Sequence, residues 1–176
     1  MKATNPDGTL VELENCWIQV GDFRKIKMKI LPDVSDSKQA TYSDMTAIGR
    51  SSPMKSYSHS DNRTISWTVH FMVTQEQDKL EISENIAMLQ SAVYPKGKND
   101  ELYSPPPLCK IKCGGGSEEL GSKEMCTILK SYSLKFPTDV AWDDELYLPY
   151  KLDMELQFEV VYNTDEFPYA EDIFQL

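Results

Sequence analysis

The sequence lacks a long hydrophobic run and a surplus of basic side chains. It has no stretch of about 18 apolar residues, the length that a membrane-spanning helix needs, and no apolar run follows Lys2 as it would in a secretory signal. Free duplex DNA is bound through many Lys and Arg contacts to phosphates, and 18 basic against 28 acidic residues supply no such footprint. We therefore expect no membrane anchor, no secretory signal and no general binding to free duplex DNA.

Cysteine is also scarce, with four residues in a chain of 176, too few for a disulfide-stapled protein of this size. Cys109 and Cys113 have a spacing that suggests metal ligands, but on a strand four residues span about 13 Å. Two thiolates that far apart cannot share one zinc, whose bonds to sulfur are about 2.3 Å. We expect buried structural thiols in a reducing compartment, with no metal site and no cofactor.

The acidic charge is concentrated at one end of the chain. From Asp143 to Leu176 there are ten acidic side chains and one basic one, so this stretch carries −9 of the formal net charge of −10. The preceding residues are close to neutral. The length and a hydrophobic content of 40% are typical of one domain with a substantial core.

Alternation of apolar and polar residues is the strongest local pattern, and it predicts antiparallel strands with one packed and one wet face. Lys151–Tyr162 alternates throughout, with Asp153, Glu155 and Glu159 on the wet face, and Ile65–Thr74 alternates in the same way. In Cys126–Phe136 the expected apolar face is interrupted by Lys130. Shorter or weaker strand candidates are Cys16–Val20, Ile26–Ile30, Ala40–Gly49 and Leu108–Cys113.

One helix is expected, over Asp78–Val93, because its apolar residues follow a nearly helical spacing: Leu80, Ile82, Ile86, Leu89 and Val93. Asp78 or Ser83 would cap its start, and Tyr94-Pro95 would end it. Ser51–Arg63 is polar and poor in apolar anchors, so we expect a long connection there. The fold class predicted is mainly β: an antiparallel β-barrel or sandwich with one covering helix.

No motif points to catalysis. Gly114-Gly115-Gly116-Ser117 is followed by two acids instead of the Gly-Lys-Ser/Thr of a phosphate-binding loop. His59 and His70 have no partner at a recognisable spacing for a nucleophile triad. Asp153, Glu155 and Glu159 could form a glycosidase pair or a cation site, since alternate residues on a strand are about 7 Å apart. A solvated acidic sheet face explains them more simply, and we expect no enzyme.

The order of elements resembles the tail-tube fold of contractile phage tails and related injection machines. The resemblance covers about residues 40–162 and is carried by three segments: Asn62–Phe71 before the single helix; Ile86–Pro95 with Pro105-Pro106-Pro107-Leu108 and the strand to Gly114; and Thr127–Leu134, Phe136–Val140, Trp142-Asp143 and Leu152–Tyr162. The first 40 residues and the tail from Asn163 depart from it. They suggest a ring at the tube–baseplate junction in place of a plain tube subunit.

The resemblance implies a six-fold ring of copies of this chain, contacts with adjacent tail tube and baseplate proteins, and DNA passing through the lumen without specific binding. Asp153, Glu155 and Glu159 would face that lumen and repel the DNA backbone. The protein would belong to the virion and be assembled in the host cytoplasm. A monomeric β-sandwich module that binds a basic peptide or a carbohydrate is the alternative, and a hydrolase built on the three acids is a third reading.

The C-terminal segment combines aromatic residues with acids. We expect a tail-tube-like β domain over residues 1–162, which includes an N-terminal extension of residues 1–39, and a docking tail over residues 163–176. Its large apolar side chains would anchor on a neighbouring subunit or on the chain's own barrel: Phe167, Tyr169, Ile173, Phe174 and Leu176.

Overall fold

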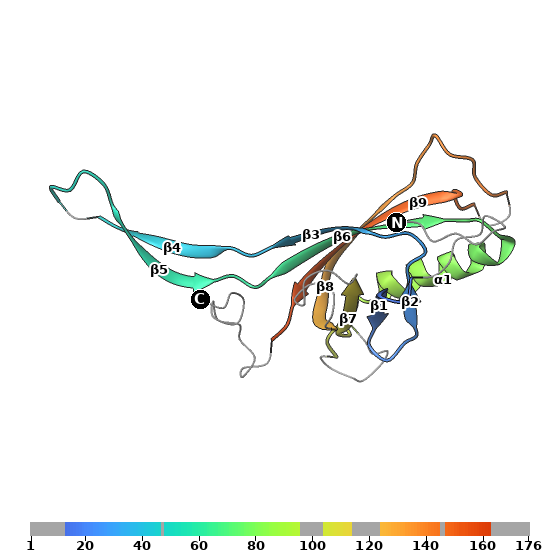
Figure 1. Ribbon diagram of the computed structural model, residues 1–176, viewed down its shortest axis with the longest axis horizontal. Coiled ribbons are helices and arrows are strands. Elements are labelled where there is room, and N and C mark those ends of the chain that lie inside the picture. The colour runs from blue at the N-terminus through green and yellow to red at the C-terminus, as the bar shows by residue number, and fades with distance from the viewer. Residues whose placement is uncertain (1–12, 47, 96–103, 114–123, 145–146, 163–176) are drawn as a thin grey trace.

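Figure 1 shows a computed structural model of the protein, an elongated molecule with a long β arm extending from a body of sheet and helix. The structure describes residues 13–46, 48–95, 104–113, 124–144 and 147–162. Its elements are β1 (Cys16–Val20), β2 (Lys25–Lys27), β3 (Asp33–Ser37), β4 (Ala40–Met45), β5 (Met54–Ser60), β6 (Thr64–Met72), α1 (Glu76–Ser91), β7 (Cys109–Cys113), β8 (Met125–Lys135) and β9 (Lys151–Val160).

The body is built on a seven-stranded sheet in the order β2-β1-β7-β8-β9-β6-β3. Every pairing in it is antiparallel. The predicted mainly β, antiparallel fold with one helix is therefore confirmed. Within the described residues of one chain the sheet is open, with β2 and β3 at its two edges, and no closed barrel forms.

The alternation predicted over residues 65–74 and 151–162 is confirmed within the strands β6 and β9. In β6, Ile65, Trp67 and Val69 are buried. They pair in register with β9, whose inward side chains are also buried: Leu152, Met154, Leu156, Phe158 and Val160. Trp67 and Phe158 meet edge to face with ring centroids 6.0 Å apart. These two strands form the middle of the core because each presents an unbroken apolar side.

The sequence alternation assigns Cys126, Ile128, Tyr132, Leu134 and Phe136 to one apolar face, and this assignment is wrong in the first half of β8. Thr127 and Leu129 are buried there, while Ile128 is exposed. The register against β9 shifts between Leu129 and Ser131, and Lys130 is the extra residue. A bulge of one residue reverses which side chains point inward. Beyond it Tyr132 and Leu134 pack against the core, as the alternation predicts.

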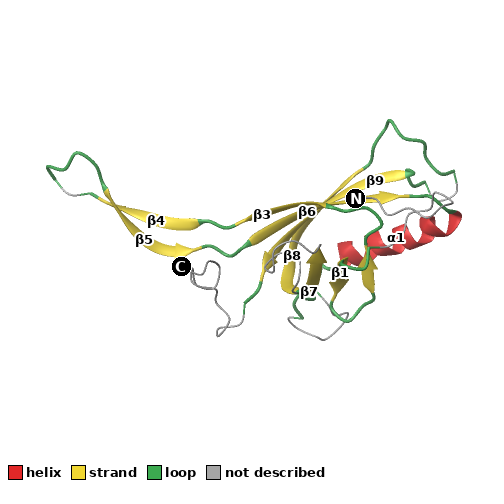
Figure 2. Ribbon diagram, in the orientation of Figure 1, coloured by secondary structure: helices red, strands yellow, loops and turns green. Residues whose placement is uncertain are grey.

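The polar segment expected to be a long connection is instead a strand. β5 pairs antiparallel with β4 as a separate two-stranded sheet, and Figure 2 shows this pair continuing the direction of β3 and β6 away from the body. We call β4, β5 and the turn between them the arm. Because almost every side chain on the arm is exposed, no buried side produces the alternation by which a strand is recognised in a sequence.

The helix α1 begins earlier than expected, at Glu76 after the cap residue Gln75. Asp78 is the third residue of the helix, and its Oδ2 accepts bonds from the backbone N–H groups of Thr74 and Gln75, both at 3.0 Å. Leu80, which the helical spacing placed on the apolar face, is 63% exposed. The other residues of the predicted apolar face agree with the structure: Ile86 and Leu89 are buried, and Ile82 and Val93 pack partly against the core, together with the buried cap residue Ala92.

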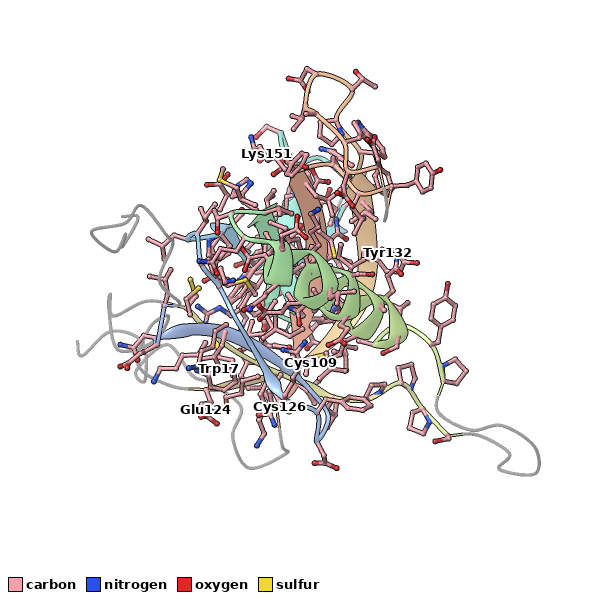
Figure 3. All side chains as sticks on the ribbon, turned by 90° about the vertical axis from the view of Figure 1, so that its right-hand side faces the viewer. Trp17, Cys109, Glu124, Cys126, Tyr132 and Lys151 are labelled. Atoms are coloured by element: carbon pink, nitrogen blue, oxygen red, sulfur yellow. The ribbon has the colours of Figure 1, made fainter. Side chains whose placement is uncertain are left out.

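Polar contacts fix α1 to the rest of the body. Lys29 Nζ lies 2.8 Å from Asp78 Oδ1, and Arg24 Nη2 lies 2.8 Å from Asn85 Oδ1. On the other side, Lys79 forms a buried ion pair with Asp143. Part of the acidic charge counted before the last strand is thus a structural anchor for the helix. Figure 3 shows α1 lying across the sheet, with Lys151 on one side of it and Trp17 on the other.

Replacing Asp78 with Asn should remove a pH-dependent part of the stability. Burial alone would raise the pKa of Asp78, but the bonds from Lys29, Thr74 and Gln75 outweigh it and hold the pKa well below its ordinary value of 3.8. The carboxylate therefore stabilises the fold at every pH above 3.8, and this contribution is lost as the pH falls further toward the pKa of the folded state.

We expect Asp78→Asn to cost about 1–2 kcal/mol at neutral pH, the loss of a charged cap and of the Lys29 pair. Urea unfolding of both proteins measures the difference across pH. It should stay constant between pH values of about 5 and 8 and shrink below about 4. A difference that grows on acidification would show that Asp78 does not stabilise the fold as an anion.

Candidate functional site

The sheet has a second, polar side that faces away from the core. It runs across β3, β6, β9 and β8, and register pairs such as Ser66 with Gln157 and Ser133 with Glu155 place its side chains in rows. We call this surface the polar face. It consists of Asp33, Ser35, Ser37, Thr64, Ser66, Thr68, His70, Lys130, Ser131, Ser133, Lys135, Asp153, Glu155, Gln157 and Glu159.

The three predicted lumen acids all lie on the polar face, in the order expected from the alternation of β9. Each of them has a partner on a neighbouring strand. Asp153 Oδ1 lies 2.7 Å from His70 Nδ1, and Glu155 forms an ion pair with Lys135. Glu159 lies 2.7 Å from Lys130 Nζ through Oε2.

The basic partners change the electrostatics of the polar face. The Lys130 ammonium and the Asn62 amide, 2.7 Å from Glu159 Oε1, lower the pKa of Glu159. The Glu155 carboxylate raises the pKa of Lys135. The lowered pKa keeps Glu159 ionised at neutral pH, the raised pKa does the same for Lys135, and each charge lies against an opposite one on the adjoining strand. The polar face is a compensated surface with a small acidic excess, where the sequence suggested a purely acidic one.

These basic partners could not be read from the β9 sequence, because Lys130 and Lys135 belong to β8 and reach β9 only through the antiparallel pairing. One sequence signal does exist. Lys130 interrupts the apolar alternation of its own segment, and in the structure that interruption is the bulge that directs Lys130 toward Glu159. The position of Lys130 within an apolar pattern thus indicated a carboxylate partner on the adjoining strand, which is Glu159.

The edge strand β3 is held at the border of the polar face by two acids. Arg63 forms a bidentate contact with Asp36, at 2.8 Å from Nε to Oδ1 and 2.6 Å from Nη2 to Oδ2. Asp33 Oδ2 lies 3.3 Å from His70 Nε2. β3 pairs on one side with β6, and its other side has no strand beside it in the described part of the chain.

The arm carries a group of exposed apolar side chains. Tyr42 and Tyr57 are opposite each other on β4 and β5, are 55% and 58% exposed, and meet edge to face at 5.8 Å. Met45 and Met54 form the next exposed apolar pair toward the turn. Ile48 in the turn is also fully exposed. We call these five residues the arm patch.

A second exposed aromatic group lies in the segment that connects β8 to β9. Phe136 and Trp142 stack with centroids 6.0 Å apart, and each remains about half exposed. Tyr147 and Tyr150 are exposed in the same connection. In Figure 1 this connection lies at the opposite end of the molecule from the arm. The elongated molecule therefore carries exposed apolar groups at both ends.

A shallow polar hollow lies where the arm joins the body. It is lined by His59, Ser60, Asp61, Asn62, Thr64, Lys130 and Glu159. The alternative function, a module for a basic peptide or a carbohydrate, would place its ligand here. None of the described residues that line the hollow is a Phe, Tyr or Trp. These residues therefore offer no aromatic ring on which the apolar face of a ligand could stack.

Other predicted features are tested only in part. Among the described residues, no three His, Cys, Asp or Glu side chains gather as a metal site would require. No helix in the described ranges is long and apolar enough to cross a membrane. The predicted docking residues, Phe167, Tyr169, Ile173, Phe174 and Leu176, lie outside the described residues.

Compared with protein-family models and with curated proteins, the chain matches none. What it does is therefore inferred from its own residues and their geometry.

Proposed function

We propose that this protein is a structural subunit of a contractile phage tail, and that copies of it form a six-fold ring at the tube–baseplate junction with a lumen for DNA. The arm is the observation that carries the proposal. It is a two-stranded sheet that leaves the body and exposes the arm patch. An exposed arm of this kind has no evident role in an isolated monomer. In an assembly it can contact a neighbouring molecule.

The arm is a poor structure for a chain that acts alone. An isolated two-stranded hairpin is marginally stable in water, because it has no layer to cover its apolar side chains. The arm patch leaves five large apolar side chains exposed, with the Tyr42–Tyr57 pair and the Met45–Met54 pair on alternate faces of the two-stranded sheet. Gatherings of exposed apolar side chains often mark sites of contact with another protein. The arm patch is therefore suited to contact a neighbouring subunit, an adjacent tail tube ring or a baseplate protein.

The open sheet supports ring formation independently. Its edge strands β2 and β3 have unpaired sides within the described residues, and exposed strand edges tend to pair with other chains. A contact between two different edges of identical chains is heterologous, and it closes into a ring when the rotation between neighbours allows it. Six copies joined in this way would extend the antiparallel sheet around a pore.

The polar face is suited to line that pore. DNA is held by proteins through Lys and Arg contacts that release counterions from phosphates. Lys130 and Lys135 are each bound to a carboxylate of β9, which reduces what they offer to a phosphate. Uncharged Ser, Thr and Gln side chains fill much of the surface between them. A face with a small acidic excess would let DNA slide without holding it.

Assembly into a ring would also determine the role of the C-terminal residues and the location of the protein. The C-terminal residues 163–176 would dock on a flanking baseplate or tube protein, and the ring would be built in the host cytoplasm and retained in the virion. The protein would act through its geometry and catalyse no reaction. The strand edges would close the ring. The arm patch would contact the next layer, and the polar face would line the path of the DNA.

Neutralising the three acids tests the role of the polar face. The variant Asp153→Asn, Glu155→Gln, Glu159→Gln leaves Lys130 and Lys135 without carboxylate partners, so the face becomes cationic. We expect particles to assemble in normal numbers, and DNA ejection to slow by about tenfold or more at low salt, with recovery at high salt as counterions screen the lysines. Ejection is followed by the fluorescence of a DNA-binding dye outside the particle.

A matched control adds Lys130→Gln and Lys135→Gln to the same variant, which makes the polar face neutral again. Ejection should return to nearly the wild-type rate. If the three-acid variant folds but forms no rings, the polar face is a contact between subunits and does not line the lumen. Ejection that is unchanged at every salt concentration would also contradict a lumen position.

A further inference from the structure

Two of the four cysteines lie opposite each other on neighbouring strands. Cys16 at the start of β1 is in register with Cys113 at the end of β7, and their Sγ atoms are 3.6 Å apart although the residues are 97 positions apart in the chain. Cys109 lies opposite Val20 in the same ladder. All four cysteines are free thiols in this structure. The fold therefore brings together two thiols that are too far apart in the sequence for their spacing to predict a pair.

The backbone at this pair already has the geometry of a cross-strand disulfide. The N–H of Gly21 donates to the carbonyl of Leu108 at 2.8 Å, so these two residues form a hydrogen-bonded pair of the ladder. Bonded and non-bonded pairs alternate along antiparallel strands, which makes Cys16 and Cys113 a non-bonded pair with Cα atoms about 4.5 Å apart. Disulfides span Cα distances from about 4.4 Å to 6.8 Å, so only the two sulfur atoms have to approach.

The two thiols differ in access and in acidity. Cys16 is 1% exposed, whereas Cys113 is half-buried. The thiol of Cys16 donates to Cys113 Sγ, and this bond lowers the pKa of Cys113 and raises that of Cys16. Because the thiolate is the nucleophile, Cys113 is the residue that reacts first with an oxidant, and Cys16 is placed to resolve the product.

We propose that Cys16 and Cys113 form a reversible dithiol–disulfide site that exchanges with a small-molecule disulfide of the glutathione type. The Cys113 thiolate attacks one sulfur of glutathione disulfide, which forms a mixed disulfide and releases one glutathione thiolate. Cys16 then loses its proton to solvent, and its sulfur attacks Cys113 Sγ and releases the second glutathione. Two protein thiols are oxidised and one glutathione disulfide is reduced to two thiols.

The oxidation state of this cysteine pair would depend on the redox conditions around the protein. In a reducing compartment it stays a dithiol, as in this structure. In an oxidising medium the disulfide would join β1 to β7 and close a chain segment of 97 residues. Such a bond stabilises chiefly by restricting the unfolded chain. This inference does not depend on the proposed role in a phage tail.

Glutathione disulfide added to the purified full-length protein tests the proposal directly. Intact mass spectrometry should show the loss of two hydrogen atoms with no retained glutathione, and peptide mapping without reductant should join the peptides of Cys16 and Cys113. The melting temperature should rise by roughly 10 °C, and dithiothreitol should reverse both changes. A stable glutathione adduct at Cys113, or a link that maps to Cys109 and Cys126, would overturn the proposal.

Single variants define the order of the two steps. Cys16→Ser should stop at a glutathione adduct on Cys113, whereas Cys113→Ser should give neither the adduct at that position nor the cross-link. Cys126→Ser, the matched control at the other half-buried thiol, should form the cross-link as the wild type does. Mapping of the wild-type protein decides the question even if a variant at the buried Cys16 fails to fold.

Discussion

Replacing Trp67 by Ala is expected to lower the free energy of unfolding by about 3–5 kcal/mol, the largest single effect that the core predicts. Trp67 is 1% exposed in the centre of β6 and packs edge to face on Phe158 of β9. Removal of its ring leaves a cavity between the two strands that share the most extensive pairing register of the sheet. Urea unfolding followed by circular dichroism measures the loss.

A second substitution at the same position distinguishes the contribution of ring packing to stability from that of the buried indole N–H. The indole Nε1 of Trp67 is buried and has no hydrogen-bond partner among the residues that the structure describes. Trp67→Phe removes this unsatisfied N–H while keeping an aromatic ring against Phe158, so it should cost only about 1–2 kcal/mol. If Trp67→Phe destabilised the protein as much as Trp67→Ala does, the ring contact would not account for the stability of this part of the core.

The second large effect is expected in assembly. Tyr42→Ser combined with Tyr57→Ser removes the aromatic pair of the arm patch, whose rings meet at 5.8 Å and are more than half exposed. Because the body does not bury these rings, its unfolding free energy should change by no more than about 0.5 kcal/mol. Ring or particle formation should fall at least about tenfold, since exposed aromatic anchors dominate the energy of interfaces.

Leu80→Ser provides the matched control. Leu80 is 63% exposed on α1, comparable with the two tyrosines, and belongs to the body. It should leave both stability and assembly almost unchanged. Sedimentation and negative-stain electron microscopy of the assembled products compare the two variants. Normal assembly by the tyrosine variant, or equal loss in both, would show that the arm patch is not a specific contact.

The parts of the fold that the sequence predicted well are those with one buried and one wet side. β6 and β9 were assigned with their inward residues because Ile65, Trp67 and Val69, and their partners from Leu152 to Val160, are apolar at every second position. The single helix was also predicted, since its spacing departs from a period of two. Asp78 was expected only as a cap of the helix. Its ion pair with Lys29, and that of Lys79 with Asp143, were not predicted, because the partners are distant in the chain.

Two elements escaped sequence reasoning for physical reasons. The arm has no buried side, so β5 carries no alternation and resembles a polar connection. The bulge at Lys130 reverses the inward face of β8 partway along the strand, so a constant period of two fails there. Both features belong to the candidate site. The side chains of the arm are exposed, and Lys130 is held by Glu159 of the adjoining strand, so neither is placed by the core.

The concentration of acid at the C-terminal end acquires a more specific meaning in the structure. Asp143 is buried against Lys79 and holds the helix. Glu155 and Glu159 are bound to lysines of β8, and Asp153 is bound to His70. Most of the described acids in this part of the chain are thus neutralised locally. A lumen lined by them would carry only a small acidic excess, so DNA would pass over it without strong attraction or strong repulsion.

Electron cryomicroscopy of the assembled particle tests the central claim most directly. We expect a ring of six copies in which β6, β8 and β9 surround a pore, with Asp153, Glu155 and Glu159 directed toward its axis and the arm reaching the next layer. A ring whose symmetry is neither six-fold nor three-fold, or one in which the polar face points away from the axis, would contradict the proposed function.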